Sequence, residues 1–418
     1  MQSNHPDNPD QGEAINSGFS GSGLLDHLDQ SSVELDQDTL RQAIPELPSV
    51  EGWKDIEIEE CGEKLEPFGP FSKNNDIFTS SVYYGEHDLS PYAESETRLN
   101  GALIVMFARK EVVASVRHAQ QLLPDGHHLI VLDSYRTLKV QQALYDHYSN
   151  GLKTKHPDWD DDALSAETQK YVSLPSAVAT RPSPHNTGGA VDLAIFRLPD
   201  EIEARVKAID DRLDQLSGQL PDNPTPEQEA TDPAMRESYL IEMRKIGLIR
   251  EHAEFLNFGT QFDHGGSEAE ANYFEKLDQT RPLTPDETEA RDNRRILHNV
   301  MAQAKMQAYA PEWWHFNSIK SQMGAKTAGL HEAEYGGIEL SEDNLEQEEM
   351  REQHRQGLIK IKEGKLGSHH FAGKLDLLAP KDDTLAKLIL LNVEALNETG
   401  DPRITHLPKA AVIAPSAE

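Results

Sequence analysis

The stretch SPHNTGGAVD, at residues 183–192, constrains the fold of this chain more than any other feature. Its histidine and aspartate lie seven residues apart, with two adjacent glycines between them. In a regular strand such positions face opposite sides, and adjacent glycines are costly in a helix. The sequence therefore predicts a turn at His185, unusual dihedrals or close backbone approach at Gly188 and Gly189, and a strand over 190–195. Such a turn can direct an imidazole and a carboxylate toward one metal ion.

A second motif, PEWWHFN at residues 311–317, supplies further metal-binding chemistry. Its aromatic residues favour an extended segment packed against a core, with Glu312 just before the strand and His315 on it. A catalytic zinc site typically has three protein ligands from His, Asp or Glu and leaves one position open for water. His185, Asp192 and His315 form such a set. Glu312 is then a candidate general base for the water.

Composition narrows the possible partners. Acidic residues number 72 against 40 Lys plus Arg, a net charge of −32, which argues against binding to nucleic acid or to anionic membranes. Cys61 is the single cysteine, so an intramolecular disulfide and a cysteine-rich zinc site are both excluded. The chain has no secretory-signal pattern and no run of about 18 apolar residues. We therefore expect a cytoplasmic protein with neither nucleic-acid nor membrane partners.

Composition shifts along the chain divide it into three parts. Residues 1–45 are polar, which predicts a mobile tail. Residues 46–330 have the pattern of a globular domain and carry both motifs. Residues 331–418 are acidic and are predicted to form a helical extension. Charged helices at 198–220 and near 233–256 predict a solvated hairpin inserted at about 198–257. The remaining predicted elements are a strand at 128–136 and helices at 98–123, 137–151 (between Thr137 and Gly151) and 292–310.

Both motifs resemble those of a known family. Ser-x-His-x-x-Gly-x-Ala-x-Asp followed by Glu-x-x-His is similar to the D-alanyl-D-alanine dipeptidases, zinc enzymes of the vancomycin-resistance type within the D-Ala-D-Ala metallopeptidase and lysostaphin-like group. The stretch LDSYR (132–136) resembles the family's Asp-Gly-Tyr-Arg, with Ser134 in place of glycine, and FGTQFD (258–263) resembles its Met-Gly-Ser/Thr-x-Phe-Asp. The resemblance spans about 75–318. The tyrosine-bearing N-terminal segment of the family has only a loose counterpart at 74–85.

The resemblance implies roles for individual residues. One zinc ion per chain would be held by the three ligands named above, with Glu312 as the catalytic acid/base. Arg136 would polarise the scissile carbonyl and stabilise the oxyanion. Asp263 would lie near the free amino group of the substrate, and Ser183 near the substrate. Asp133 could orient Arg136 or its neighbour Tyr135, or cap the helix that follows.

These roles lead to an expected fold and activity. We expect an α+β domain with a mainly antiparallel central sheet, flanking helices, and zinc on the concave face of the sheet. The expected reaction is hydrolysis of a small D,D-dipeptide, D-alanyl-D-alanine, in cell-wall precursor metabolism, D-alanine recycling or glycopeptide resistance; the oligomeric state is left open. One alternative is a peptidoglycan D,D- or L,D-carboxypeptidase or endopeptidase, and another is a non-catalytic zinc-binding module. Glu312 and Arg136 favour an enzyme, because a structural site needs neither.

Overall fold

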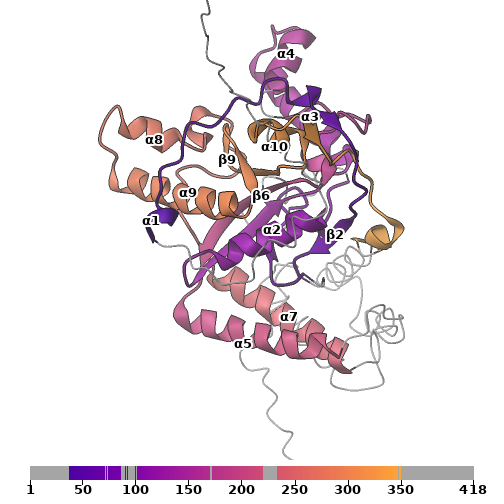
Figure 1. Cartoon of the computed structure of the whole chain (residues 1–418), viewed down its shortest axis with the longest axis vertical. Helices are drawn as coiled ribbons and strands as arrows, with labels where there is room; N and C mark the ends of the chain where they lie inside the picture. The colour runs from indigo at the N-terminus through magenta and orange to yellow at the C-terminus, as the bar shows by residue number, and fades with distance from the viewer. Residues whose placement is uncertain are drawn as a thin grey trace, which may run out of the picture. The chain divides into compact units, whose positions relative to one another are not determined.

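The computed structural model describes residues 37–349, apart from 71, 73, 86–89, 91, 93–98, 100, 170–171, 220–232 and 347. Helices and sheets are mixed throughout this part of the chain (Figure 1), which confirms the α+β class. Most of the predicted N-terminal tail, and the predicted extension beyond residue 349, lie outside the described residues.

The larger sheet carries the site. Its strand order is β3-β5-β6-β9-β8, with β7 also paired to β6; only β3 and β5 run parallel among the pairings of this sheet. The register places Asp192 of β6 opposite Asp133 of β5 and opposite His315 of β9. Three polar residues therefore form a row across the sheet. The strands are β3 (Phe78–Thr79), β5 (His127–Asp133), β6 (Ala190–Arg197), β7 (Glu254–Phe255), β8 (Met306–Tyr309) and β9 (Glu312–Ser318).

Two smaller sheets and a set of helices surround this sheet. Strand β1 (Glu57–Ile58) pairs in parallel with β10 (Glu332–Ala333), and β2 (Leu65–Phe68) pairs antiparallel with β4 (Met106–Arg109). The helices are α1 (Gln37–Leu40), α2 (Lys110–Gln121), α3 (Leu138–Lys155), α4 (Asp161–Thr168), α5 (Asp200–Ser217), α7 (Pro233–His252), α8 (Tyr273–Asp278), α9 (Pro285–Gln303) and α10 (Gln322–Thr327). Short 3-10 segments are η2 (Trp53–Asp55), η3 (His185–Thr187) and η4 (Ser267–Ala269).

Helices α5 and α7 pack against each other and occupy the lower part of Figure 1. They correspond to the two charged helices predicted between the site segments. Helix α5 is not solvated on all sides, because Ile202, Val206, Ile209 and Leu213 are buried in the main hydrophobic core. Four apolar residues at helical spacing form the stripe that an amphipathic helix buries.

Three helix predictions were wrong at their boundaries. Residues 106–109, assigned to a helix, form the fully buried strand β4. A short apolar run is compatible with either a helix or a strand, and here pairing with β2 decides for the strand. Residues 306–309 also form a strand, since α9 ends at Gln303 and Lys305 adopts a positive φ of 62°. Helix α3 begins after the predicted cap Thr137 but continues through Gly151 to Lys155. A glycine weakens a helix by about 1 kcal/mol and need not end it.

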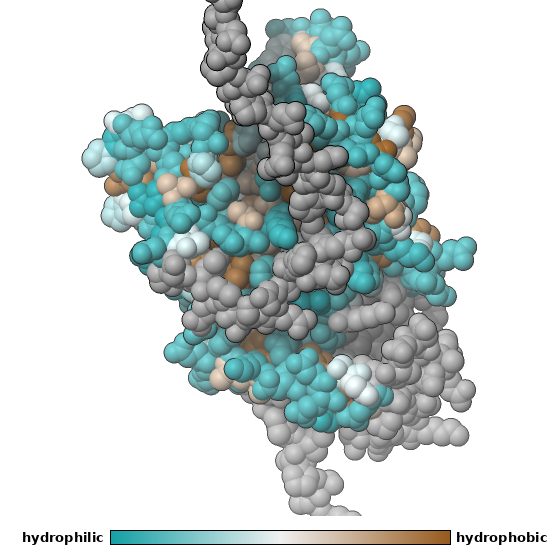
Figure 2. Space-filling model, in the orientation of Figure 1, coloured by the Kyte–Doolittle hydropathy of each residue, from teal (hydrophilic) through white to brown (hydrophobic). Residues whose placement is uncertain are grey.

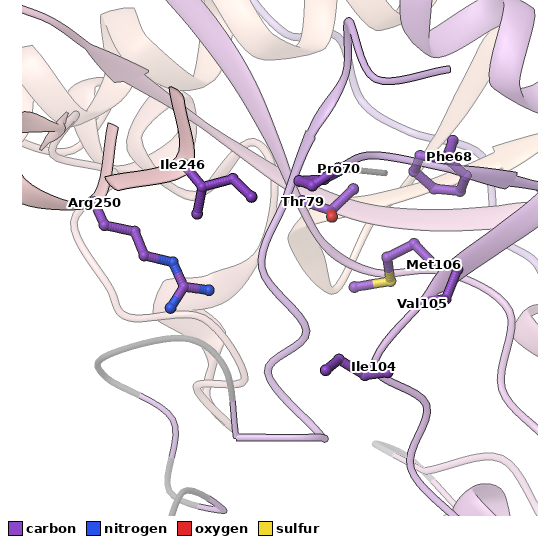
Figure 3. Close-up of a pocket in the computed structure, with 8 residues that line it drawn as sticks. All are labelled: Phe68, Pro70, Thr79, Ile104, Val105, Met106, Ile246 and Arg250. Carbon is purple, nitrogen blue, oxygen red and sulfur yellow. The ribbon is translucent and has the colours of Figure 1, made fainter. Parts of the chain in front are cut away.

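The described surface in Figure 2 is mostly hydrophilic, as the composition predicts. A small cavity of about 20 Å³ is lined by residues including Phe68, Met106 and Ile246. Figure 3 shows these side chains. The cavity has room for about one water molecule and contains no residue of either motif. No helix within the described ranges is long and apolar enough to cross a membrane.

Candidate metal centre

The turn that carries His185 explains the two glycines of the first motif. Gly188 has a φ of +69°, and a Cβ there would lie 2.3 Å from a methyl carbon of Leu65. At Gly189 an added Cβ would lie 2.9 Å from the ring of Tyr335. Positive φ and close approach are both conditions that favour glycine. The predicted turn is confirmed, and the strand that follows it, β6, brings Asp192 back beside His185.

The predicted ligands come together. His185, Asp192 and His315 are buried and each offers one donor atom, with all three atoms within 4.8 Å of one another. His185 Nε2 lies 3.2 Å from His315 Nδ1 and 3.5 Å from Asp192 Oδ1, and the remaining pair is 2.8 Å apart. Ligands about 2.0–2.1 Å from a tetrahedral zinc ion lie roughly 3.3 Å from one another. The donor set therefore fits such an ion.

Neighbouring groups determine which ring nitrogens can bind a metal. His185 Nδ1 lies 2.6 Å from the carbonyl oxygen of Ser134, and His315 Nε2 lies 3.2 Å from Oδ1 of Asn317. Each of these nitrogens donates its hydrogen to the oxygen, which leaves the other nitrogen with a free lone pair facing the cluster. Although burial opposes ionisation, the two histidines hold the pKa of Asp192 well below its usual range. All three groups are thus prepared to accept a cation.

Glu312 borders the cluster. It is the first residue of β9, rather than the residue before that strand, and follows the two-residue turn that joins β8 to β9. Its Oε2 lies 3.7 Å from His315 Nδ1, and its side chain is 20% exposed. Burial raises the pKa of Glu312 to about 7, against the lowering effect of His315. A carboxyl group with a pKa near 7 beside a metal position is suited to transfer protons, although a bound cation would lower that value.

Arg136 follows β5 and is held on several sides. Its Nε donates to Asp133, and its Nη2 donates to the Tyr83 hydroxyl at 3.2 Å and to Asp192 Oδ2 at 3.3 Å. The guanidinium also lies over the Tyr83 ring, 4.7 Å from its centre. Asp133 therefore orients Arg136, and its Oδ2 is also 3.2 Å from His185 Nδ1. One carboxylate thus contacts both a metal ligand and the arginine.

The 258–263 loop brings Asp263 to the same site. Phe258 stacks on Trp313 with ring centres 4.2 Å apart, and the indole Nε1 of Trp313 donates to Thr260 Oγ1 at 2.9 Å. At the end of this anchored loop Asp263 adopts a positive φ of 65°, a strained conformation for a residue other than glycine. Its carboxylate is hydrogen-bonded to Tyr83. The loop is therefore held against β9 by aromatic contacts.

Asp263 as a whole is an exposed residue, but its carboxyl group lies among several site residues. Burial among these neighbours raises the pKa of Asp263 to about 6, while Arg136 acts to lower it. Tyr83 links the two, because its hydroxyl contacts both side chains. Tyr83 lies in the 74–85 stretch, and the sequence signal for it was only the loose family resemblance and the pair Tyr83-Tyr84. Its role in the site could not be assigned from the sequence.

Ser183 is buried rather than open to the site. Its Oγ contacts Asn186 Oδ1 at 2.8 Å and Gln141 Oε1 at 3.2 Å, and Asn186 donates to the carbonyl oxygen of Arg136. These bonds hold the His185 turn against the loop that carries Arg136. The predicted position of Ser183 near the substrate stays a prediction.

Residues 240–331 match the family model Peptidase_M15, which is described as D-ala-D-ala dipeptidase. This match over part of the chain supports the D-Ala-D-Ala metallopeptidase family. This confirms the family inferred from the motifs and supports a metallopeptidase. The matched segment contains Asp263, Glu312 and His315, whereas the first motif lies outside it. No curated protein matches the chain.

Proposed function

We propose that this metallopeptidase is a zinc-dependent dipeptidase that hydrolyses D-alanyl-D-alanine. The observation that carries the proposal is the convergence of three parts: the buried His185, Asp192 and His315 cluster, Glu312 in contact with His315, and Arg136 in contact with Asp192. A metal site that serves only structure has four protein ligands and needs neither an adjacent carboxyl group nor an arginine.

The donor set favours zinc. Two imidazoles and one carboxylate match zinc sites of the catalytic type, in which one position stays open. When bound, the ion would supply Lewis acidity to the carbonyl group and to the water of the reaction. The hydrogen bonds that His185 and His315 make to Ser134 and Asn317 would keep both rings in the correct tautomer.

Protein side chains then provide the remaining chemistry. Glu312 would take a proton from the attacking water and pass it to the leaving amine, a task for which a pKa near neutrality is favourable. Arg136 would place its positive charge against the oxyanion that forms at the scissile carbonyl. Because Asp133 and Tyr83 already hold the guanidinium, it needs little reorganisation during the reaction.

Asp263 would select for a dipeptide. A carboxylate beside Tyr83, on the solvent-open side of the site, can pair with the free ammonium group of a short substrate. Acylation of that amine removes its charge and adds bulk, so longer peptides would lose the interaction. The product would be free D-alanine, which suits a role in cell-wall precursor metabolism.

The test compares D-Ala-D-Ala with N-acetyl-D-Ala-D-Ala. We expect at least a roughly hundredfold lower kcat/KM for the acetylated form, since a hydrogen bond between charged groups is worth about 1.5–3 kcal/mol, the acetyl group adds bulk beside Asp263, and each 1.4 kcal/mol is tenfold. Asp263→Asn should reduce this discrimination by slowing cleavage of the free dipeptide, with zinc content unchanged. Asp278→Asn, at a helical carboxylate that pairs with Arg291, is the matched control. Equal cleavage of both substrates by the wild-type protein would contradict the dipeptidase and favour the peptidoglycan carboxypeptidase.

A further inference from the structure

Residues 334–338, called the strap below, lie immediately beyond the segment that matches the family model. Every backbone amide in the strap donates a hydrogen bond to another part of the chain. The acceptors are Lys320 O for Glu334 and Tyr335 (2.8 and 2.9 Å), a Glu60 carboxylate oxygen for Gly336 (2.7 Å), Ala179 O for Gly337 (2.8 Å) and Asn186 O for Ile338 (3.2 Å). The strap is therefore fixed along its whole length.

Ile338 joins the two loops that carry the site. Its amide donates to the carbonyl oxygen of Asn186, the residue after His185. Its own carbonyl oxygen accepts from the Tyr135 hydroxyl at 2.8 Å, and Tyr135 directly precedes Arg136. A single residue of the strap thus contacts the immediate neighbours of a metal ligand and of the arginine.

Tyr335 packs beneath the glycine turn. It is fully buried, and its ring is one of the groups that a Cβ on Gly189 would meet, at 2.9 Å. The buried Arg109 also contacts this ring, with its guanidinium 4.8 Å from the ring centre. Arg109 donates through Nε to Thr187 O at 2.8 Å and through Nη2 to Gly336 O at 3.1 Å. The same cation therefore binds both the motif turn and the strap.

The charge of Arg109 is satisfied in this position. Glu60 accepts from Nη1 at 2.9 Å and from Nη2 at 3.0 Å, and it also accepts the amide of Gly336. The guanidinium is therefore paired and hydrogen-bonded, as a buried charge has to be. At Gly336 an added Cβ would lie 3.0 Å from the Ala179 carbonyl oxygen, which shows how closely the strap approaches the loop before the first motif.

We infer that the strap is a positioning element for the active site: it fixes the His185 turn relative to Arg136, and so sets the separation of the metal site from the oxyanion-binding arginine. A misplacement of about 1 Å at a reacting centre can cost about a hundredfold in rate. The inference rests on the proposed function for its turnover measurement, but zinc affinity tests it without any substrate.

The experiment uses full-length Tyr135→Phe, which removes only the hydroxyl that donates to Ile338 and keeps the ring in its apolar cluster. Tyr145→Phe is the matched control, because it removes a tyrosine hydroxyl that bonds Ser165 between α3 and α4. The zinc dissociation constant is measured by competition with a chromophoric chelator, and kcat and KM are measured separately. The urea midpoint reports stability.

We expect Tyr135→Phe to weaken zinc binding and to lower kcat, each by roughly tenfold, the lower end of the range for groups that support metal ligands, with KM little changed. Tyr145→Phe should change neither zinc affinity nor kcat. In a second pair, Ile338→Pro removes the amide that donates to Asn186, whereas Ile338→Val keeps it, and only the proline variant should show both losses. If Ile338→Pro does not fold, the tyrosine pair decides alone.

If Tyr135→Phe and Tyr145→Phe lower the urea midpoint by the same amount and bind zinc with the same affinity, the strap only stabilises the fold. That outcome overturns the inference even when turnover cannot be measured. If the wild-type protein binds zinc but does not cleave D-Ala-D-Ala, the proposed function fails, and a selective loss of zinc affinity in Tyr135→Phe still supports the strap.

Discussion

Replacing Glu312 with Gln should separate activity from stability. Gln has nearly the same shape but cannot accept the proton of the attacking water. Because a positioned general base contributes about 10²- to 10⁴-fold, we expect kcat to fall by that range. The three ligands are untouched, so zinc content should stay at one ion per chain.

The same substitution should stabilise the metal-free protein. Burial raises the pKa of Glu312 from 4.5 to about 7, so the folded state disfavours the charged form. At about 1.4 kcal/mol per pKa unit this is about 3 kcal/mol, and since the side chain is 20% exposed, solvent screening reduces the expected gain to about 1–3 kcal/mol. Gln carries no charge and avoids this cost. Bound zinc would neutralise much of the effect, because the cation favours the carboxylate.

The pH dependence of the stability gain in Glu312→Gln shows whether burial of the Glu312 charge causes it. A carboxyl group whose folded pKa lies above its unfolded value destabilises the fold only where it is ionised. Below about pH 4.5 it is protonated in both states and the substitution has no effect; the advantage of Gln grows up to about pH 7 and is constant above that value.

The assay is urea unfolding of the chelated proteins at about pH 5 and pH 8, followed by tryptophan fluorescence, beside dipeptide hydrolysis with zinc. Glu289→Gln, at an exposed residue of α9, is the control and should leave both measurements unchanged. Near-normal turnover of Glu312→Gln would show that this residue is not the base. An equal stability change at both pH values would refute the argument from burial of the charge.

Two further substitutions test the metal and the arginine. His185→Ala should lose stoichiometric zinc and the thermal stability that zinc adds, because a ligand of the folded state stabilises it; undiminished zinc by metal analysis would contradict the assigned ligand set. Arg136→Lys should keep zinc but lower kcat by about a hundredfold or more, within the range for loss of one oxyanion donor. A lysine cannot reproduce the planar fork that reaches Asp133 and Tyr83 together, and near-normal turnover would leave Arg136 a structural role only.

Local chemistry made the metal cluster predictable. The two adjacent glycines indicated a turn between His185 and Asp192, because glycine readily adopts a positive φ such as the 69° observed at Gly188. The Glu-x-x-His spacing on an aromatic strand likewise placed Glu312 beside His315. Strand β5 and the cap of α3 at Thr137 followed from short runs of residues as well. In each case the information lies within about ten neighbouring residues.

Boundaries of elements were harder to predict. The segments at 106–109 and 306–309 have apolar spacing that suits either a helix or a strand. Residues 106–109 form a strand because they pair with β2, which is remote in the chain. Residues 306–309 form a strand because the turn at Ala310 and Pro311 brings β9 beside them. Strand preference depends on cross-strand packing more than on the intrinsic tendency of the residues.

The sequence by itself determined the ligand types, the glycine turn and the family that the motifs resemble. Only the tertiary structure decided that Asp133 serves both His185 and Arg136, that Tyr83 joins Arg136 to Asp263, and that the strap packs beneath the glycine turn. Apart from Asp133 and Arg136, which are three positions apart, the residues in these contacts are dozens to hundreds of positions apart. The contacts depend on the register that aligns β5, β6 and β9, and on the packing of buried side chains between loops, neither of which a local pattern of residues encodes.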